Sequence, residues 1–350
     1  MGRVSFVAAT VLALAAAARA EERPAAKFTC AACHRAEAES QPNTAMGVGL
    51  EMPPNQSVLR AHPKLTFARG GYNYLIESDG NRSTYTVSDA SGTLSLPIRY
   101  AFGAHSQTFV LEYRGRFYES IVSFYATTGA LGVTVGNGTI EPHNLVEAMG
   151  RLTTESEITA CFGCHSSGAV TDGKLTLQTM APGLTCEHCH AGANAHMQGL
   201  AAGKPGPPPK KLGAMNAEQT SEFCGQCHRT WESIVRLRQF GEGNMRFQPY
   251  RLANSPCFAG ADARIRCTAC HNPHANPATE PSAYDHNCLA CHSPGAPPVA
   301  GEQAPRAKIC PMARANCVSC HMPRMQLPAG PIFFSDHQIR IVHPGDPYPN

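Results

Sequence analysis

Apolar and polar residues alternate along much of the chain between residues 65 and 140. Such alternation, with many β-branched and aromatic side chains, favours strands that bury one face. The segments are YNYLIES (72–78), STYTVSD (83–89), TLSLPIRYAFG (93–103), QTFVLEYRG (107–115), RFYESIVSFYA (116–126) and LGVTVG (131–136). Asp79-Gly80 and Arg114-Gly115 fall at segment ends and indicate tight turns. We therefore predict an antiparallel β-domain over residues 65–140, a stretch without cysteine.

Apolar residues recur at helical spacing in two later stretches. These are NLVEAMGRLTTESEITACFGCH (144–165) and NAEQTSEFCGQCHRTWESIVRLRQF (216–240), and both predict helices. Asn216 is placed to cap the second helix. The proline-rich stretches 203–211 and 293–305 predict exposed loops.

One five-residue unit, Cys-x-x-Cys-His, occurs seven times and uses 14 of the 16 cysteines. Numbered in chain order, the motifs are Cys30-Cys33-His34, Cys161-Cys164-His165, Cys186-Cys189-His190, Cys224-Cys227-His228, Cys267-Cys270-His271, Cys288-Cys291-His292 and Cys317-Cys320-His321. The unit is the attachment signature of c-type haem. Two thiols form thioethers with the haem vinyl groups, and the adjacent imidazole becomes the proximal iron ligand. We predict seven covalent haem c groups, each with its iron.

Paired cysteines also occur in zinc sites and in redox dithiols, neither of which requires a histidine at the next position. Histidine makes up 16 of the 350 residues, yet it follows all seven pairs. Chance would produce that with odds below roughly one in a billion. The zinc and dithiol interpretations are therefore rejected.

Nine histidines outside the motifs are available as distal ligands, more than seven haems require. His274 and His196 follow proximal histidines too closely to bind the same iron, so each is predicted to bind a neighbouring haem. His337, whose apolar neighbours in IFFSDHQIRI would bury it, and His62, between the first motif and the strand-rich stretch, are also predicted distal ligands. We interpret the remaining histidines as residues without an iron; these are His105, His143, His188, His286 and His343. The number of available histidines neither requires nor excludes an iron without a distal ligand.

Three further residues have alternative interpretations. Met46 is a candidate distal ligand for the first haem, although core packing is the commoner role of methionine. Cys257 and Cys310 lie outside the motifs, and a lone pair of cysteines in an oxidising compartment favours a disulfide. Trp231 follows the fourth motif and is predicted to pack on a porphyrin.

The spacing of the motifs indicates the fold class. Six of the seven motifs lie between residues 161 and 321, about 27 residues per haem, which is too few for a separate apolar core around each. We therefore predict a multihaem cytochrome: mostly short α-helices and loops wrapped around packed haems, with an inserted antiparallel β-domain. Packed haems are what electron transfer requires.

The N-terminus is typical of a secretory signal peptide. Arg3 precedes an apolar run of about 15 residues, short for a membrane span of roughly 20, and small residues close the run at Ala20. The predicted divisions are a signal peptide (1–20), an N-terminal segment with the first haem (21–64), the β-domain (65–140) and a six-haem domain (141–350). The protein is expected to be periplasmic or secreted, and soluble after cleavage.

The sequence pI of about 8.1 carries no argument for nucleic-acid or membrane binding. Seven haems would add about fourteen propionate carboxylates, so the assembled protein is expected to be net acidic.

The motif-bearing segments resemble the exported multihaem cytochromes of the cytochrome c-554 class. The resemblance rests on CFGCH, PGLTCEHCHAGANAH, FCGQCHRTW, NMRFQPYRLANSPCF, RIRCTACHNPH, YDHNCLACH and CVSCHMPR followed by FFSDHQIRI, in that order. It implies distal ligation by His196 and His274 on haems other than their own, and a further distal ligand at His337. It also implies electron transfer as the default function.

The leading hypothesis is an electron-transfer protein that relays electrons between a quinol-linked donor, such as a membrane quinol-oxidising complex, and a terminal acceptor. Its partners would be redox proteins rather than nucleic acid. The alternative is a multihaem oxidoreductase acting on a small nitrogen or sulfur compound at a five-coordinate haem, which needs acid–base residues over the open iron. The sequence contains no clear catalytic candidate. A haem-based sensor is disfavoured, because a sensor needs no chain of seven haems.

Overall fold

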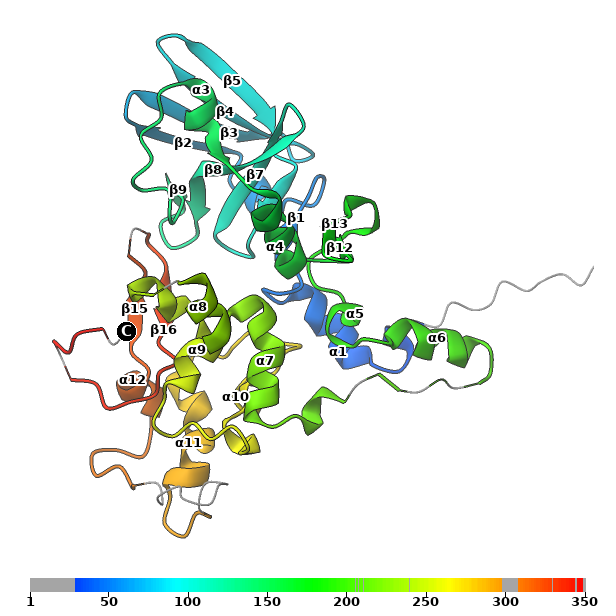
Figure 1. The fold of residues 1–350 in the computed structure, drawn as a ribbon, viewed down its shortest axis with the longest axis vertical. Helices are drawn as coiled ribbons and strands as arrows, with labels where there is room; N and C mark the ends of the chain where they lie inside the picture. Colours follow the sequence, from blue (N-terminus) through cyan, green and yellow to red (C-terminus); the bar gives the residue numbers. More distant parts are fainter. Residues whose placement is uncertain are drawn as a thin grey trace, which may run out of the picture.

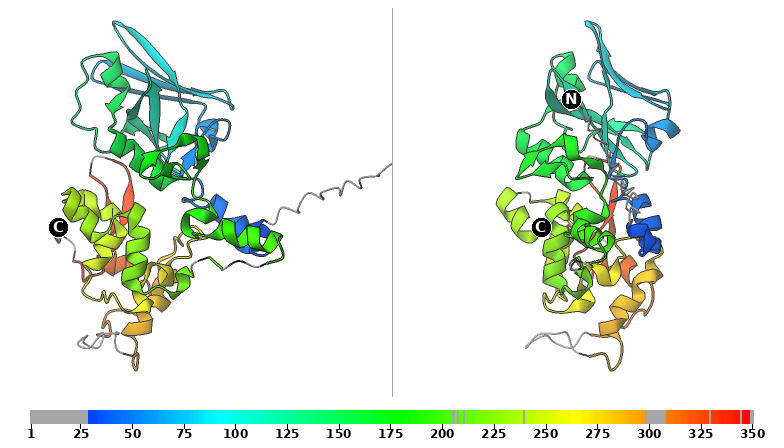
Figure 2. Two further views of the ribbon diagram at one scale, coloured as in Figure 1. Left: turned by 45° about the vertical axis from the view of Figure 1, so that its right-hand side comes forward. Right: turned by 90° about the vertical axis from the view of Figure 1, so that its right-hand side faces the viewer.

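The computed structural model describes residues 29–348 except 205, 207, 210, 239, 298–307, 329 and 344. The predicted signal peptide and most of the loop at 293–305 lie outside the described residues. Figure 1 shows a β-rich part above a helical part, with α1 (Arg35–Ser40), α5 (Cys186–Cys189) and α6 (Ala193–Ala201) to one side. The same division is visible in both views of Figure 2.

Two antiparallel sheets form the β-rich part. The strands of the first are β2 (Lys64–Arg69), β3 (Tyr72–Ser78), β4 (Ser83–Asp89) and β5 (Gly92–Pro97), paired in that order. The strands of the second are β1 (Leu50–Glu51), β6 (Tyr100–Phe102), β7 (Gln107–Tyr113), β8 (Arg116–Tyr125) and β10 (Gly150–Leu152) in that order, with β9 (Ala130–Val133) also paired to β8. The strands predicted from alternation are thus confirmed, and β1, β2 and β10 are additional.

Alternate residues of these strands face a common core. Tyr74 and Ile76 on β3 are buried, as are Tyr85 and Val87 on β4, and they pack with side chains from β7 and β8 in one cluster. The predicted turn at Arg114-Gly115 is confirmed, because both residues have positive φ, 51° and 71°, as a tight two-residue hairpin requires.

The predicted helix over 144–165 is interrupted, so that prediction was wrong at its centre. The segment forms α3 (Leu145–Met149), strand β10 and α4 (Glu155–His165). Gly150 pairs with Ser120 on β8, and a Cβ at Gly150 would lie 2.7 Å from the carbonyl oxygen of Glu119. Close backbone pairing to the sheet therefore overrides the helical spacing.

Capping boxes begin the two longest helices that carry motifs. In α4 the Thr154 hydroxyl accepts the N–H of Glu157, whose carboxylate accepts the N–H of Thr154. In α7 (Ala217–His228) Asn216 and Gln219 make the same exchange, which confirms the predicted cap. The helix predicted over 216–240 is nevertheless interrupted after His228, because Arg229 has a positive φ of 64°.

The remaining elements are short. The other α-helices are α2 (Ser57–Ala61), α8 (Trp231–Leu237), α9 (Gln248–Ala253), α10 (Cys267–Cys270), α11 (Asp285–His292) and α12 (Cys317–His321). The 3-10 helices are η1 (Cys30–Ala32), η2 (Gln41–Asn43), η3 (Leu177–Thr179), η4 (Leu212–Ala214), η5 (Glu242–Arg246), η6 (Ala263–Ile265) and η7 (Pro281–Tyr284). Three two-stranded sheets pair β11 (Ser166–Ser167) with β14 (Ala181–Pro182), β12 (Val170–Thr171) with β13 (Lys174–Leu175), and β15 (Arg324–Gln326) with β16 (Phe333–Ser335).

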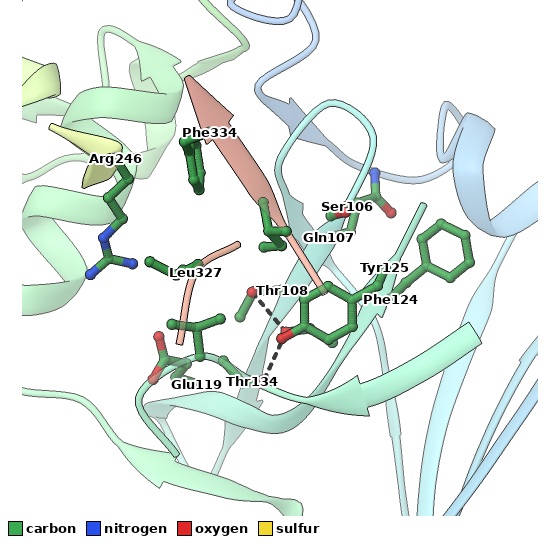
Figure 3. A pocket seen from close by; sticks show the side chains of 13 residues that line it. Ser106, Gln107, Thr108, Glu119, Phe124, Tyr125, Thr134, Arg246, Leu327 and Phe334 are labelled. Atoms are coloured by element: carbon green, nitrogen blue, oxygen red, sulfur yellow. Dashed lines mark hydrogen bonds between the residues drawn. The ribbon is translucent and has the colours of Figure 1, made fainter. Parts of the chain in front are cut away.

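The hairpin β15–β16 joins the two parts of the molecule. A cavity of about 210 Å³ lies between this hairpin and β7–β9. Figure 3 shows its lining, with Leu327 and Phe334 on one side and Thr108 and Thr134 on the other. The hydroxyls of Thr108 and Thr134 both bond to Ser123. The buried Oε1 atom of Gln107, which also lines the cavity, has no hydrogen-bond partner among the described residues.

Within the part of the chain that the structure describes, none of the helices combines the length and apolar composition needed to cross a membrane.

Candidate haem-attachment sites

Each motif lies on a turn of helix. The second, fourth and sixth motifs end α4, α7 and α11, and the third, fifth and seventh occupy α5, α10 and α12; the first lies on η1 and its end. Residues three apart on a helix face the same side, so the two cysteines of a motif present neighbouring thiols. None of the fourteen motif cysteines forms a disulfide, so each remains available for a thioether bond to haem.

Four motif helices present faces that other protein elements leave uncovered. The helices α5, α10, α11 and α12 contain no buried residue. Within the described part of the chain, the two clusters of buried apolar side chains instead lie between residues 50 and 180. Short, uncovered motif helices fit the attachment of a large apolar group that is itself part of the core.

Hydrogen bonds to backbone carbonyls orient several imidazoles. The Nδ1 atoms of three motif histidines lie close to carbonyl oxygens: His165 to Gly49 at 2.9 Å, His292 to Lys308 at 2.7 Å and His321 to Arg340 at 2.9 Å. His337 makes the same bond to Ser335 at 2.9 Å. A carbonyl can only accept, so Nδ1 carries the proton and Nε2 keeps its lone pair for a metal. These residues therefore fit axial ligation of haem iron.

Two pairs of imidazoles have the separation expected across one iron. His190 of the third motif and His274 have ring centroids 6.1 Å apart. His271 of the fifth motif and His337 are also 6.1 Å apart. Two imidazoles on opposite sides of one metal would have centroids about 6 Å apart, given metal–nitrogen bonds of about 2 Å. His274 and His337 thus lie opposite histidines of motifs other than those they follow in the chain.

Burial keeps the buried imidazoles in their neutral form. Desolvation lowers the pKa of His165, His228 and His271 below the ordinary value of 6.5. It lowers the pKa of His337 to about 4. Neutral imidazole is the form that binds a metal, so these side chains are ready for ligation at neutral pH.

Thiols of different motifs lie near one another. In four inter-motif pairs one thiol shifts the pKa of the other: Cys30–Cys186, Cys164–Cys227, Cys224–Cys267 and Cys288–Cys317. Cys189 also interacts electrostatically with Cys224 and Cys227, and Cys270 with Cys288. These interactions relate all seven motifs, and the fourth motif has interacting thiols in the second, third and fifth.

The β-rich part holds the second motif. Phe162, a spacer residue of that motif, is fully buried, and its ring meets Tyr100 at 5.0 Å and Phe102 at 5.1 Å between centroids. Phe102 also meets the His165 ring edge-on at 5.4 Å. Burial raises the pKa of the Cys161 thiol to about 11. The second attachment site is therefore built partly from strand β6.

The other candidate ligands have different surroundings. His62 caps the end of α2 and packs on Phe124 of β8, with centroids 4.5 Å apart. His196 lies in α6, and its buried Nδ1 has no hydrogen-bond partner among the described residues. The Met46 carbonyl accepts the N–H of Leu184, two residues before the third motif. His34 is exposed and contributes to the low pKa of His190 after burial and His274.

The expected disulfide between Cys257 and Cys310 is absent, since both residues are free thiols. Cys257 interacts with Cys291 and Cys288 of the sixth motif. The Cys310 thiol instead accepts backbone N–H groups of Ala313 and Met312, which lower its pKa. The two thiols have separate environments, which explains why that expectation was wrong.

Among the described residues, no three His, Cys, Asp or Glu side chains gather in a way that could hold a metal ion. Structural zinc sites need four such ligands.

Residues 139–191 match the family model of cytochrome c554 and c-prime. The match supports a cytochrome of the c-554 class. It spans the second and third motifs and implies a c-type cytochrome with covalent haem c and its iron, acting in electron transfer. A bound haem supplies an iron that carries one electron at a time. Neither the curated proteins nor the solved structures contain a match to this chain.

Two features of the sites escaped the sequence analysis. Gly49 acts only through its backbone carbonyl, for which a side-chain pattern holds no signal. Asp336 is fully buried beside His337, and the only signal was a single acidic residue inside the apolar run IFFSDHQIRI.

Proposed function

We propose that the protein is a periplasmic heptahaem c-type cytochrome that transfers electrons between a quinol-linked donor and a terminal acceptor. The match of residues 139–191 to the family model of cytochrome c554 and c-prime supports the electron-transfer role. The number of haems rests on the seven motifs. Export rests on the N-terminal sequence, which is typical of a signal peptide.

The proximity of thiols from different motifs supports the proposal. After haem attachment each motif sulfur is bonded to a carbon at the porphyrin edge, so neighbouring sulfurs bring neighbouring porphyrin edges together. Cys164–Cys227 and Cys224–Cys267 connect the second, fourth and fifth motifs in this way. The remaining interactions extend the series to both ends. A continuous series of closely spaced carriers suits relay of electrons through the protein better than one isolated reaction centre.

The imidazole pairs support the same interpretation for two sites. His190 with His274, and His271 with His337, would provide two axial nitrogens each. An iron with two protein ligands has no open position for a substrate, so these sites favour transfer over catalysis.

Haem content and ligation state test the proposal. The mature protein, produced with its haem-maturation system, should carry seven haems by intact mass and by haem absorbance. Electron paramagnetic resonance should be dominated by low-spin iron. Zinc or unmodified thiols at the motifs would contradict the proposal. A high-spin iron that binds cyanide stoichiometrically would instead favour an oxidoreductase.

A further inference from the structure

A buried ion-pair cluster lies next to one candidate iron ligand. Asp336 is fully buried, and Arg251 on α9 is 1% exposed. Arg251 binds both carboxylate oxygens of Asp336, with Nε–Oδ1 at 2.8 Å and Nη2–Oδ2 at 2.9 Å. Arg340 adds a third bond, Nη1–Oδ2 at 2.6 Å. Such two-pronged arginine–carboxylate contacts fix direction as well as distance.

The cluster folds the chain from residue 335 to residue 340 into a tight loop. The N–H of Gln338 donates to Asp336 Oδ1 at 3.1 Å, and Arg340 Nη1 donates to the carbonyl of Gln338 at 2.9 Å. The N–H of Asp336 donates to the carbonyl of Pro323 at 3.0 Å. One carboxylate therefore organises the whole loop.

His337 lies inside this loop. Its Nδ1 donates to the Ser335 carbonyl at 2.9 Å. The Ser255 hydroxyl donates to the His337 carbonyl at 3.1 Å and accepts the N–H of Ile339 at 2.8 Å. The backbone on both sides of the imidazole is thus held, and the ring lies 6.1 Å from that of His271 in the fifth motif.

The other end of the loop holds His321 of the seventh motif. The Arg340 carbonyl accepts Nδ1 of His321 at 2.9 Å, and the Arg340 N–H donates to the His321 carbonyl at 3.2 Å. The position of the Arg340 carbonyl depends on the Arg340 side chain, which is bound to Asp336.

We infer that Asp336 is a positioning residue shared by axial imidazoles on two haems, the fifth through His337 and the seventh through His321. This inference rests on the haem assignment proposed above. It goes beyond stabilisation of the fold, because the cluster acts on the orientation of two specific rings. Arg340 is expected to act on His321 with little effect on His337, since Arg251 still binds Asp336 without it.

The test compares haem-loaded variants by electron paramagnetic resonance, cyanide binding and redox titration. In Asp336→Asn, two of the seven haems should change their low-spin signals and reduction potentials, and cyanide binding should appear at those sites. In Arg340→Ala, the change should be confined to one haem. Val87→Ala, which removes two methyl groups from a fully buried site of the β-rich core, is the control. It should lower the unfolding midpoint and leave every haem signal unchanged.

The proposed function and the positioning role of Asp336 would fail in different ways. A wild-type protein without seven haems would contradict the proposed function. A fully loaded wild type whose Asp336→Asn and Arg340→Ala variants keep wild-type haem signals would overturn the positioning role alone. Equal spectral changes in Val87→Ala would also overturn it, because general destabilisation would then explain them.

Discussion

The imidazoles of His190 and His274 lie with their centroids 6.1 Å apart and their planes within 9° of each other. They are separated by 84 positions in the chain, and one follows the third pair of cysteines while the other follows the fifth. The segment that carries the fifth motif thereby reaches back to the third. Each such pair of imidazoles brings two segments that carry motifs close together without an apolar core between them.

Removing His274 should therefore open one haem. We expect His274→Ala to convert one of seven low-spin irons to a high-spin or solvent-ligated form, because the third haem would lose its distal nitrogen. The measurement is the high-spin signal in electron paramagnetic resonance, quantified per haem. His143→Ala is the control, since His143 is exposed and pairs only with Glu147 among the described residues. An unchanged spectrum in His274→Ala would exclude this ligand.

Chelators should leave the prosthetic groups in place. Zinc domains unfold when a chelator takes their metal, whereas covalently attached haem retains its iron in the porphyrin. We expect excess EDTA to change neither the visible absorbance nor the unfolding midpoint by calorimetry. A fall in the midpoint on EDTA treatment would point to a structural metal and against haem at the motifs.

Phe162 should contribute to stability more than other spacer residues of the motifs. It is fully buried against Tyr100 and Phe102, so Phe162→Ala should cost about 3–5 kcal/mol of unfolding free energy. Val318 occupies the same spacer position in the seventh motif, on a helix without buried residues. Val318→Ala should therefore cost less than about 1 kcal/mol. Denaturant unfolding followed by circular dichroism gives both values. Similar losses of unfolding free energy in the two variants would show that the packing of Phe162 on Tyr100 and Phe102 does not stabilise the second motif.

Glu157 should add acid sensitivity to the start of α4. The N–H of Thr154, and then the Arg151 guanidinium, outweigh burial and lower the pKa of Glu157 below its ordinary value of 4.5. Its interactions therefore stabilise the fold above that pH and are lost as the pH falls through the lower folded-state pKa. The side chain is 40% exposed, so the contribution is below about 1 kcal/mol.

Glu157→Gln tests this pH dependence. Glutamine can keep the capping box, as Gln219 does in α7, but it does not titrate. The unfolding midpoint of the variant should fall less steeply than that of the wild type from about pH 5 to about pH 3. Parallel curves for the two proteins would show that Glu157 does not contribute to acid unfolding.

Local patterns were sufficient for the strands and for the attachment chemistry. Alternation predicted β3 and β4 within residues 72–89 with the observed bounds, because a strand with one buried face must alternate. The motifs identify covalent haem from the sequence alone, because two thiols and an imidazole at fixed spacing are held by one helical turn. No long-range contact enters either argument.

Long-range pairing decided the rest. The second sheet takes β1 and β10 from outside the alternating stretch, and Gly150 leaves the helix because its backbone approaches Glu119. His337 lies opposite His271, and Asp336 is buried between two arginines. The sequence determined which residues can hold haem and where strands form, since both depend on neighbours a few positions apart. Only the tertiary structure decided which imidazoles and thiols meet, since those contacts join segments that no local spacing relates.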